Sequence, residues 1–231
     1  MSRVLGNRSD SFFYETGSED CLFFEKQRWH QGVKFVAGVD EAGRGPLAGP
    51  VVAGAVILRQ EDPIPGVKDS KQLSSSERET LFIEIRKRAL ALGIGVSYTE
   101  EIDEINILQA SLRAMYRAVS SLSVTPEFVL VDGNCAVPGL ARQQTVVKGD
   151  ARSASISAAS IIAKVVRDRM MDEFHLRYPS YDFATNKGYA TASHRRLIAR
   201  HGPCPIHRKT FKGVREHVQV RQLPLLNLPA R

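Results

Sequence analysis

The feature that most constrains this fold is a glycine-dense stretch at residues 36–51, VAGVDEAGRGPLAGPV. Its first part is apolar and rich in β-branched side chains, and it ends at a cluster of glycine and proline, which predicts a buried strand. The strand would present two carboxylates, Asp40 and Glu41, at its exit. The glycines that follow lack a Cβ atom, so the backbone there could approach a phosphate or a ribose closely.

Two other interpretations of this stretch compete with a functional site. A dinucleotide-binding fingerprint needs G-x-G-x-x-G at the start of a helix and an acid about 20 residues further on. Here Pro46, Pro50 and the apolar run at residues 51–58 predict a second strand instead, so we set that interpretation aside. A hairpin with a solvated, charged turn is the simpler alternative, and only the rest of the chain can decide against it.

The composition predicts a soluble protein with one large α/β core. The chain has 231 residues, of which 43% are apolar and 25% charged. It contains no run of about 18 apolar residues that could span a membrane, and no secretion signal is visible. Cys21, Cys135 and Cys204 are far apart and odd in number, which argues against a disulfide framework. We therefore expect a cytoplasmic protein.

The net charge of +7 is concentrated near the C-terminus. Residues 187–217 hold eight lysines and arginines against one acid, Glu216, so this segment alone carries the whole excess. A focused positive surface is what binding to a nucleic-acid backbone requires, although an ordinary basic surface is the simpler alternative. The eight are Lys187, Arg195, Arg196, Arg200, Arg208, Lys209, Lys212 and Arg215.

The hydrophobic pattern predicts five strands and three main helices. A capping box, Ser74 to Glu77, opens the first helix, at residues 74–92, and a second helix is expected at 101–122. The strands are expected at 33–40, 51–58, 94–99, 127–132 and 145–147.

The helix after the last strand has the most regular pattern. Apolar residues at three- or four-residue spacing predict one buried face, whereas small hydroxyls with one lysine and one aspartate lie on another. Without context, that polar face is best explained as solvated surface. The apolar face comprises Ile156, Ala159, Ala163, Val166, Met170 and Phe174, and the polar face Ser153, Ser157, Ser160, Lys164 and Asp168.

Three separate strand exits are predicted to deliver carboxylates. Asp40 and Glu41 end one strand, Asp132 ends another, and Asp150 ends the last. If these strands share a sheet, the carboxylates converge, and like charges held so close are costly unless cations neutralise them. Two Mg²⁺ or Mn²⁺ ions are the usual solution in phosphodiester chemistry, and oxygen-only ligands argue against zinc.

Six motifs occur in the order of one known family and cover about residues 33–211. On these motifs the chain resembles bacterial ribonuclease HII, of the type 2 ribonuclease H family. Two departures are visible, Thr210 where serine is usual and Lys212-Gly213 where Ala-Pro is common. The motifs are DEAGRG from Asp40, DSK ending at Lys71, DG from Asp132, KGD ending at Asp150, AASIIAKV around Lys164 and NKGY ending at Tyr189.

The resemblance implies a ribonuclease H-like fold: an α/β protein with a mixed five-stranded sheet, antiparallel in its first three strands, flanked by helices and followed by a small C-terminal helical part. It implies an endoribonuclease that hydrolyses RNA in RNA/DNA hybrids and cuts 5′ of single ribonucleotides in duplex DNA, leaving 3′-hydroxyl and 5′-phosphate ends. Two Mn²⁺ or Mg²⁺ ions would be the cofactors. The implied catalytic and metal-binding acids are Asp40, Glu41, Asp132 and Asp150.

The same resemblance implies the substrate contacts. The turn Gly43-Arg44-Gly45 would read the 2′-hydroxyl, and Tyr189 would stack on the adjacent deoxyribose, although a half-buried tyrosine is the simpler alternative. Asp168 is expected to be an intrahelical partner of Lys164 and not a metal ligand. The expected phosphate or active-site lysines are Lys71, Lys148, Lys164 and Lys187.

Two C-terminal patterns need an interpretation. We interpret His201-x-x-Cys204-x-x-His207 as a structural loop, because a fourth ligand for a metal is missing nearby. The stretch from Gln222 to Leu226 resembles the peptide by which replication proteins dock on the sliding clamp, although an apolar tail is the simpler alternative.

We expect three parts: an extension at residues 1–32, a catalytic domain at 33–200 and a basic segment and tail at 201–231. A monomer is expected. Two other functions stay open, a DNA-junction nuclease of the same fold and a non-catalytic nucleic-acid binding module. The first would lack the Gly-Arg-Gly turn and Tyr189, and the second would be expected to have lost an acid, whereas all are present.

Overall fold

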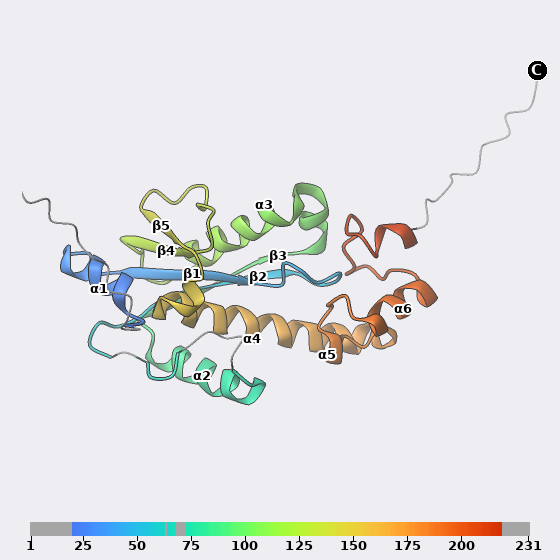
Figure 1. The fold of residues 1–231 in the computed structure, drawn as a ribbon, viewed down its shortest axis with the longest axis horizontal. Coiled ribbons are helices and arrows are strands. Elements are labelled where there is room, and N and C mark those ends of the chain that lie inside the picture. Colours follow the sequence, from blue (N-terminus) through green and yellow to red (C-terminus); the bar gives the residue numbers. More distant parts are fainter. Residues whose placement is uncertain (1–19, 63, 68–72, 219–231) are drawn as a thin grey trace, which may run out of the picture.

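A mixed five-stranded sheet forms the centre of the protein (Figure 1). The structure is a computed structural model that describes residues 20–62, 64–67 and 73–218. The strand order is β3-β2-β1-β4-β5; β1, β2 and β3 are antiparallel, whereas β4 runs parallel to β1 and β5 parallel to β4. The predicted fold class is confirmed. The strands are β1 (Val36–Ala42), β2 (Val51–Ile57), β3 (Ala91–Ser97), β4 (Phe128–Asp132) and β5 (Gln143–Val146).

Several strand boundaries differ from the prediction, and at two of them strand pairing extends the strand. β1 continues past Asp40, since Glu41 pairs with Ala53 on β2. β3 begins three residues earlier than predicted, since Ala91 finds a partner in Ile57 at the end of β2. The two carboxylates of β1 therefore lie inside the last part of the strand, where the sheet fixes their backbone.

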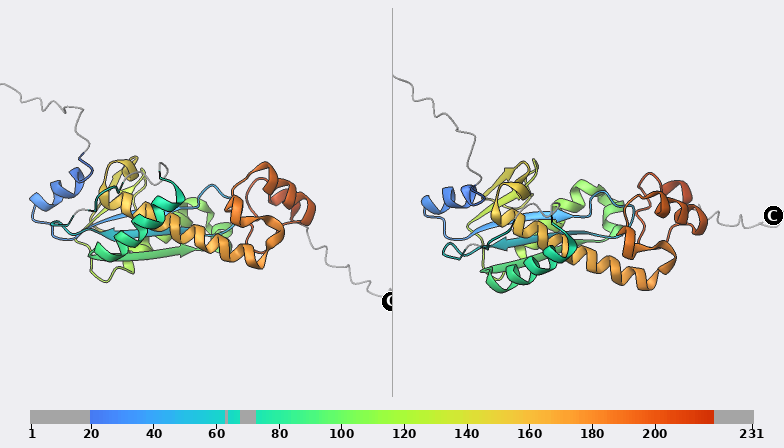
Figure 2. Two further views of the ribbon diagram at one scale, coloured as in Figure 1. Left: turned by 90° about the horizontal axis from the view of Figure 1, so that it is seen from below. Right: turned by 60° about the horizontal axis from the view of Figure 1, so that its bottom comes forward.

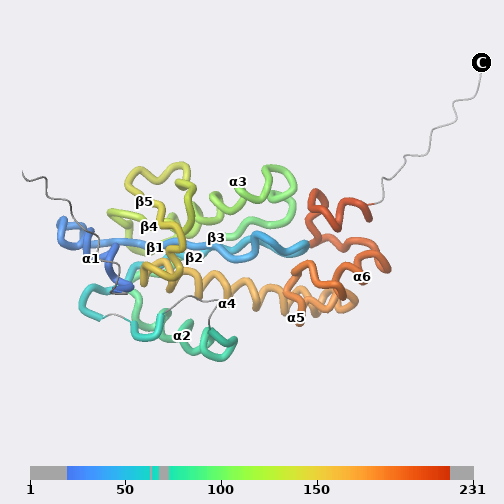
Figure 3. The backbone as a smooth tube through the Cα atoms, viewed as in Figure 1, coloured from blue at the N-terminus to red at the C-terminus, as the bar shows by residue number. Residues whose placement is uncertain are grey.

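Helices cover both faces of the sheet (Figures 1 and 3). α3 (Thr99–Ser120) packs on one face and shares a core with residues such as Val39 and Val131. α4 (Ala154–Arg177) lies across the other face, and α2 (Ser75–Arg88) packs against α4. The predicted capping box of α2 is present, with the Ser74 hydroxyl accepting a hydrogen bond from the Glu77 N–H.

The second helix is not continuous as predicted. Asn106 has φ 69° and interrupts α3, and its side-chain oxygen accepts hydrogen bonds from the N–H groups of Leu108 and Gln109. An asparagine that caps a following helical turn tolerates this conformation. Both halves of α3 bury apolar residues in the same core, so the sequence predicted one uninterrupted helix.

α4 approaches the sheet so closely that its polar face is also buried. A Cβ atom at Gly54 of β2 would lie 2.5 Å from the Ala159 carbonyl, so only glycine fits there. Ser157 and Ser160 are buried, whereas Val166, Met170 and Phe174 are partly exposed. In the first half of α4 both faces are therefore covered by protein, which decides against the interpretation of the polar face as solvated surface.

The remaining helices lie at opposite ends of the sheet (Figures 1 and 2). α1 (Phe23–His30) packs at the end where α4 begins, and the C-terminal helices gather where α4 ends. This agrees with the expected small C-terminal helical part. Those helices are α5 (Phe183–Asn186), α6 (Ala192–His201) and single 3₁₀ turns at Pro179–Tyr181 and Arg215–His217.

The departure at position 210 keeps the contact that a serine could make. The Thr210 hydroxyl donates a hydrogen bond of 2.6 Å to the Asp103 carboxylate, which also accepts from the Lys209 and Thr210 N–H groups. The C-terminal segment is thereby tied to the first turns of α3.

Cys21, Cys135 and Cys204 are free thiols, as predicted. Among the described residues, no helix has the length and apolarity needed to cross a membrane.

Candidate active site

Three of the four predicted acids meet where β1 and β4 end. β1 and β4 are parallel, with Val39 paired to Val131, so Asp40 and Asp132 follow this pair on neighbouring strands. Glu41 interacts electrostatically with both aspartates. The predicted convergence of the carboxylates of β1 and β4 therefore follows directly from the sheet topology.

Burial and mutual repulsion disfavour the charged forms of these acids. Asp40 is 5% exposed, and its pKa is raised well above the usual value, first by burial and then by Glu41 and Asp132. Its carboxylate accepts hydrogen bonds from the Glu41 N–H at 2.7 Å and from the Ser160 hydroxyl on α4. Burial raises the pKa of Glu41 to about 7, against the opposing effect of its ion pair with Arg44 at 3.2 Å.

Asp150 does not end a strand as predicted. β5 stops at Val146, and Asp150 lies in a 3₁₀ turn, Gly149–Ala151, that leads into α4. Lys148, in the left-handed region with φ 55°, redirects the chain before this turn. The turn is tied to β4, because the Asp132 carboxylate accepts hydrogen bonds from the N–H groups of Gly149 at 2.7 Å and Asp150 at 3.3 Å. Asp150 is therefore held near Asp132, and it is buried.

The chemistry of these donors fits a hard divalent cation. All the donors are carboxylate oxygens, which Mg²⁺ and Mn²⁺ prefer. A cation between them would offset the repulsion that raises the pKa values of Asp40 and Glu41. In residues 20–62, 64–67 and 73–218, no three His, Cys, Asp or Glu side chains already have the arrangement of a metal site.

The Gly-Arg-Gly turn follows the acids directly. Gly43 has φ +97°, and a Cβ atom there would lie 2.1 Å from Arg167 Nε, so this position requires glycine. A Cβ atom at Gly45 would meet nothing within 4 Å, which places Gly45 beside open space. Arg44 is exposed and pairs with Glu41. The turn thus presents backbone and one guanidinium group beside the carboxylates.

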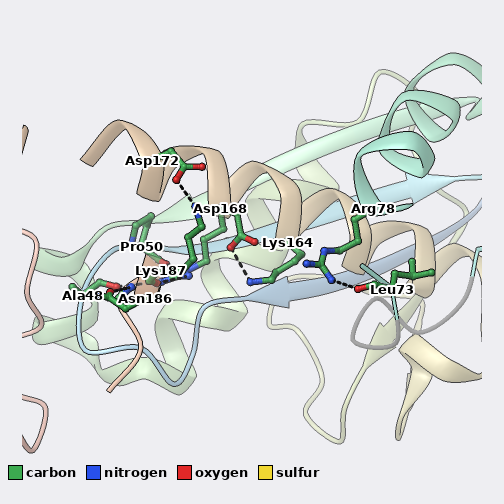
Figure 4. A network of polar contacts seen from close by, with 11 residues as sticks. Ala48, Pro50, Leu73, Arg78, Lys164, Asp168, Asp172, Asn186 and Lys187 are labelled. Carbon is green, nitrogen blue, oxygen red and sulfur yellow. Dashed lines mark hydrogen bonds and ion pairs between the residues drawn. The ribbon is translucent and has the colours of Figure 1, made fainter. Parts of the chain in front are cut away.

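Two of the predicted lysines, Lys164 and Lys187, pair with aspartates of α4 (Figure 4), and Tyr189 lies near the first of them. The Tyr189 ring is 42% exposed, and its centroid lies 5.7 Å from Lys164 Nζ. Lys164 forms an ion pair of 2.8 Å with Asp168, which agrees with an intrahelical role for that acid. Lys187 pairs with Asp172 in the same view. Lys148 is exposed beside the turn that holds Asp150, and Lys71 lies outside the described residues.

Arg167 is an important residue that the sequence analysis missed. It is fully buried, and its guanidinium donates to the carbonyls of Pro50 at 3.0 Å, Lys187 at 3.1 Å and Ala48 at 3.2 Å. Its Cζ lies 5.8 Å from the Tyr189 centroid. The signal was its four-residue spacing from Ala163 and to Met171, both buried; the prediction placed the apolar face on Val166 and Met170 instead.

One predicted contributor to the basic surface does not belong to it. Arg208 is fully buried and donates to backbone carbonyls, so its charge does not face a phosphate backbone. Burial accounts for most of the lowering of its pKa to about 9, and Arg167 adds to it. The basic side chains that do face solvent in this segment are Arg195, Arg196, Arg200, Lys209, Lys212 and Arg215.

Comparison with known proteins supplies the family. The profile described as Ribonuclease HII matches residues 37–214, which include the four acids, the Gly-Arg-Gly turn and Tyr189. The chain belongs to the ribonuclease HII family. Ribonuclease HII of Geobacter metallireducens is 56% identical over 206 residues, which cover 89% of this chain and 97% of the relative.

Two solved structures of the same type share the fold. The ribonuclease H2 of Pyrococcus horikoshii OT3 is 31% identical with a TM-score of 0.66, over 79% of this chain and 96% of that one. The RNase HII of a PCNA:RNase HII complex from Archaeoglobus fulgidus is 30% identical with a TM-score of 0.63, over 82% and 98%. As a ribonuclease HII, this chain is a divalent-metal-dependent endoribonuclease that hydrolyses the RNA of RNA/DNA hybrids.

Proposed function

We propose that this ribonuclease HII also cuts on the 5′ side of a single ribonucleotide embedded in duplex DNA. The observation that carries the proposal is the position of the Gly43 turn. It follows the end of β1, the strand that carries Asp40 and Glu41, and it packs against Arg167, whose Cζ lies 5.8 Å from the Tyr189 ring centroid. The Gly43 turn is thus available to contact a 2′-hydroxyl, and Tyr189 to contact the next sugar. Both lie close to Arg167.

Asp40, Glu41, Asp132 and Asp150 are the residues that would hold two divalent ions, Mg²⁺ or Mn²⁺. Such ions, when bound, activate a water and stabilise the leaving oxygen of an in-line displacement. The chain prepares the site in two ways: the Ser160 hydroxyl fixes Asp40, and two backbone N–H groups fix Asp132. The products would carry 3′-hydroxyl and 5′-phosphate ends.

The backbone of Gly43, Arg44 and Gly45 would contact the ribose 2′-hydroxyl, the group that distinguishes RNA from DNA. Tyr189, partly exposed over Lys164, would stack on the following deoxyribose. Lys164 and Lys187 would exchange their carboxylate partners, Asp168 and Asp172, for phosphates. Lys148, Lys71 and the exposed basic side chains of residues 195–215 would contact the duplex backbone.

Cleavage of three end-labelled duplexes tests the proposal: one DNA with a single ribonucleotide, one RNA/DNA hybrid and one all-DNA duplex. Each is incubated with Mg²⁺, Mn²⁺ or EDTA. We expect a 5′ cut at the single ribonucleotide, cleavage of the hybrid, no cleavage of DNA, and loss of all cleavage in EDTA and in Asp40→Asn. Cleavage of the hybrid alone would contradict the embedded-ribonucleotide activity. Cleavage of the all-DNA duplex would indicate a junction nuclease.

A second part of the proposal concerns a partner. The Archaeoglobus fulgidus relative forms a complex with PCNA. In this chain the stretch from Gln222 to Leu226 lies outside the described residues, and we propose it as a docking peptide for a bacterial sliding clamp on its sequence alone. A pull-down with purified clamp should fail after residues 220–231 are deleted. Unchanged clamp binding by the truncated enzyme would contradict this part. A monomeric state and a cytoplasmic location stay predictions.

A further inference from the structure

A short C-terminal segment, residues 206–208, lies against the loop that carries the Gly-Arg-Gly turn. The Gly49 N–H donates to the Ile206 carbonyl at 2.8 Å, and the Arg208 N–H donates to the Leu47 carbonyl at 2.9 Å. These bonds flank a β-bridge between Ala48 and His207. Residues 43–50, here named the reading loop, therefore depend on a segment about 160 positions away in the sequence.

The Arg208 side chain extends this contact toward the turn itself. Its guanidinium donates to the Arg44 carbonyl at 2.8 Å, to the Gly49 carbonyl at 2.9 Å and also to the Gly43 carbonyl. The ion pairs of the described residues do not include Arg208, so its charge is directed at backbone oxygens. A planar fork of donors bonded to three carbonyls fixes the conformation of a loop more firmly than a lysine could.

His207, next to Arg208, is linked through His194 to the backbone of Tyr189. The Cys204 N–H donates to His207 Nδ1 at 2.9 Å. A backbone N–H can only donate, so Nδ1 accepts and the neutral ring carries its proton on Nε2. His207 Nε2 lies 3.0 Å from His194 Nε2, which must then accept. His194 consequently carries its proton on Nδ1 and donates it to the Tyr189 carbonyl at 2.8 Å.

The surroundings keep both imidazoles neutral and in place. Burial, followed by the neighbouring His194, lowers the pKa of His207 to about 4, and burial also lowers the pKa of His194. The Tyr181 ring meets His207 edge-on at 4.9 Å between centroids, and Phe183 meets His194 edge-on at 5.5 Å. The directed chain from Cys204 to Tyr189 is therefore enclosed by aromatic rings and has one allowed pattern of protons.

We propose that Arg208, His207 and His194 are positioning residues that set the distance between the reading loop and Tyr189, and through it the preference for an embedded ribonucleotide. The inference rests on the proposed function. A single 2′-hydroxyl must reach the reading loop while the next sugar reaches Tyr189, so both contacts need one fixed spacing. A hybrid offers a 2′-hydroxyl at every position and tolerates a looser spacing.

The test compares kcat/KM on the single-ribonucleotide duplex with kcat/KM on the hybrid, because their ratio does not depend on the fraction of folded enzyme. His207→Asn keeps an acceptor for the Cys204 N–H and removes the link to His194. Arg208→Lys keeps the charge and loses the fork. Each should lower the ratio roughly 10-fold or more, since a misplacement of 1 Å costs on the order of 100-fold. The matched control is His201→Asn, an exposed histidine at the end of α6 that is outside the chain of hydrogen bonds.

If both variants keep the wild-type ratio of the two kcat/KM values, the inference is overturned and the proposed function is unaffected. Failure of the wild-type enzyme to cut the embedded ribonucleotide would instead overturn the proposed function. Nitrogen-15 NMR of the wild type provides a readout that needs no variant. We expect a proton on Nε2 of His207 and on Nδ1 of His194 at neutral pH. A proton on Nδ1 of His207 would refute the directed chain.

Discussion

Asp132 accepts a hydrogen bond of 2.7 Å from the backbone N–H of Gly149. The carboxylate at the end of β4 therefore has two tasks: it faces Asp40 and Glu41, and it holds the turn that carries Asp150. A variant that keeps the acceptor oxygen but loses the charge separates the two tasks.

Asp132→Asn should abolish activity and keep the fold. The amide oxygen can still accept from Gly149, whereas a neutral ligand binds a divalent cation more weakly, so we expect cleavage of the hybrid to fall at least about 100-fold. Asp132→Ala should also lose about 1–3 kcal/mol of unfolding free energy, because two N–H groups lose their acceptor. Hybrid cleavage and urea unfolding in EDTA measure both. Equal stability of the two variants would refute the structural task.

The contribution of Glu41 to the stability of the metal-free enzyme should fall as pH rises from about 4.5 to 7, whereas His207 and His194, whose pKa values are lowered, act in the opposite direction. The pKa of Glu41 is 4.5 in the unfolded chain and about 7 in the folded protein. Between these pH values the folded state binds more protons than the unfolded chain, so the contribution of Glu41 to the free energy of unfolding falls as the pH rises. The loss from Glu41 is at most about 3 kcal/mol. Asp40, raised for the same reasons, changes stability in the same direction.

Urea unfolding in EDTA at pH 5 and pH 8 measures this loss, and Glu41→Gln is the comparison. Relative to the wild type, the variant should gain stability as the pH rises from 5 to 8, and it should be the more stable protein at pH 8. Adding Mn²⁺ at pH 8 should increase the stability of the wild type again, because a cation that binds only the folded state stabilises it. A Glu41→Gln variant whose stability changes between pH 5 and pH 8 in EDTA by the same amount as that of the wild type would contradict the assignment, because the histidines contribute equally to both proteins.

The strands and the acids at the ends of β1 and β4 were predictable from local signals, whereas the mixed order of the sheet was implied by the family resemblance. β-Branched runs specify the strands, and the parallel pairing of Val39 with Val131 then brings Asp40 to Asp132 without further information. The position of Asp150 in a 3₁₀ turn was not predictable, since it depends on the left-handed Lys148 and on hydrogen bonds to Asp132.

Buried charged residues were the main failure of the sequence analysis. Arg167 was not singled out in the sequence and Arg208 was counted in the phosphate footprint, because lysines and arginines are rarely fully buried. Their partners are backbone carbonyls of residues 43–50 and Lys187, which lie far away in the sequence. Only the tertiary structure brings those carbonyls together, so no local pattern could identify the two arginines as supports of the reading loop.

Asp168 and Asp150 should differ sharply in their effect on activity. Asp168 pairs with Lys164 on the outside of α4, and a partly exposed pair at this spacing contributes about 0.3–0.5 kcal/mol. Asp168→Asn should therefore keep cleavage of the hybrid within about 5-fold of the wild type, whereas Asp150→Asn should lose at least about 100-fold. Steady-state kinetics over a range of Mn²⁺ concentrations distinguishes them. A loss in Asp168→Asn as large as in Asp150→Asn would make Asp168 a metal ligand.

Glu25 of α1 should contribute strongly to stability, although it is none of the four acids of the candidate site. It is fully buried, and its Oε1 accepts from the hydroxyls of Ser153 and Ser155 and, at 2.9 Å, from the Ser155 N–H. It therefore caps the N-terminus of α4, where a negative charge also favours the helix dipole. Glu25→Ala would leave these donors without their acceptor, at a cost of about 1.5–3 kcal/mol.

Thermal unfolding measures this cost, which corresponds to a fall in Tm of roughly 4–10 °C for a chain of this size. Glu25→Gln keeps one acceptor oxygen and should fall in between. The control is Lys26→Ala, at the position next to Glu25, which removes an exposed ion pair with Asp20. This variant should shift Tm by less than about 2 °C. Because α4 carries Ser160 and Lys164, a loosened α4 should also weaken cleavage at temperatures just below the Tm. A Tm unchanged in Glu25→Ala would show that the N-terminus of α4 does not depend on α1.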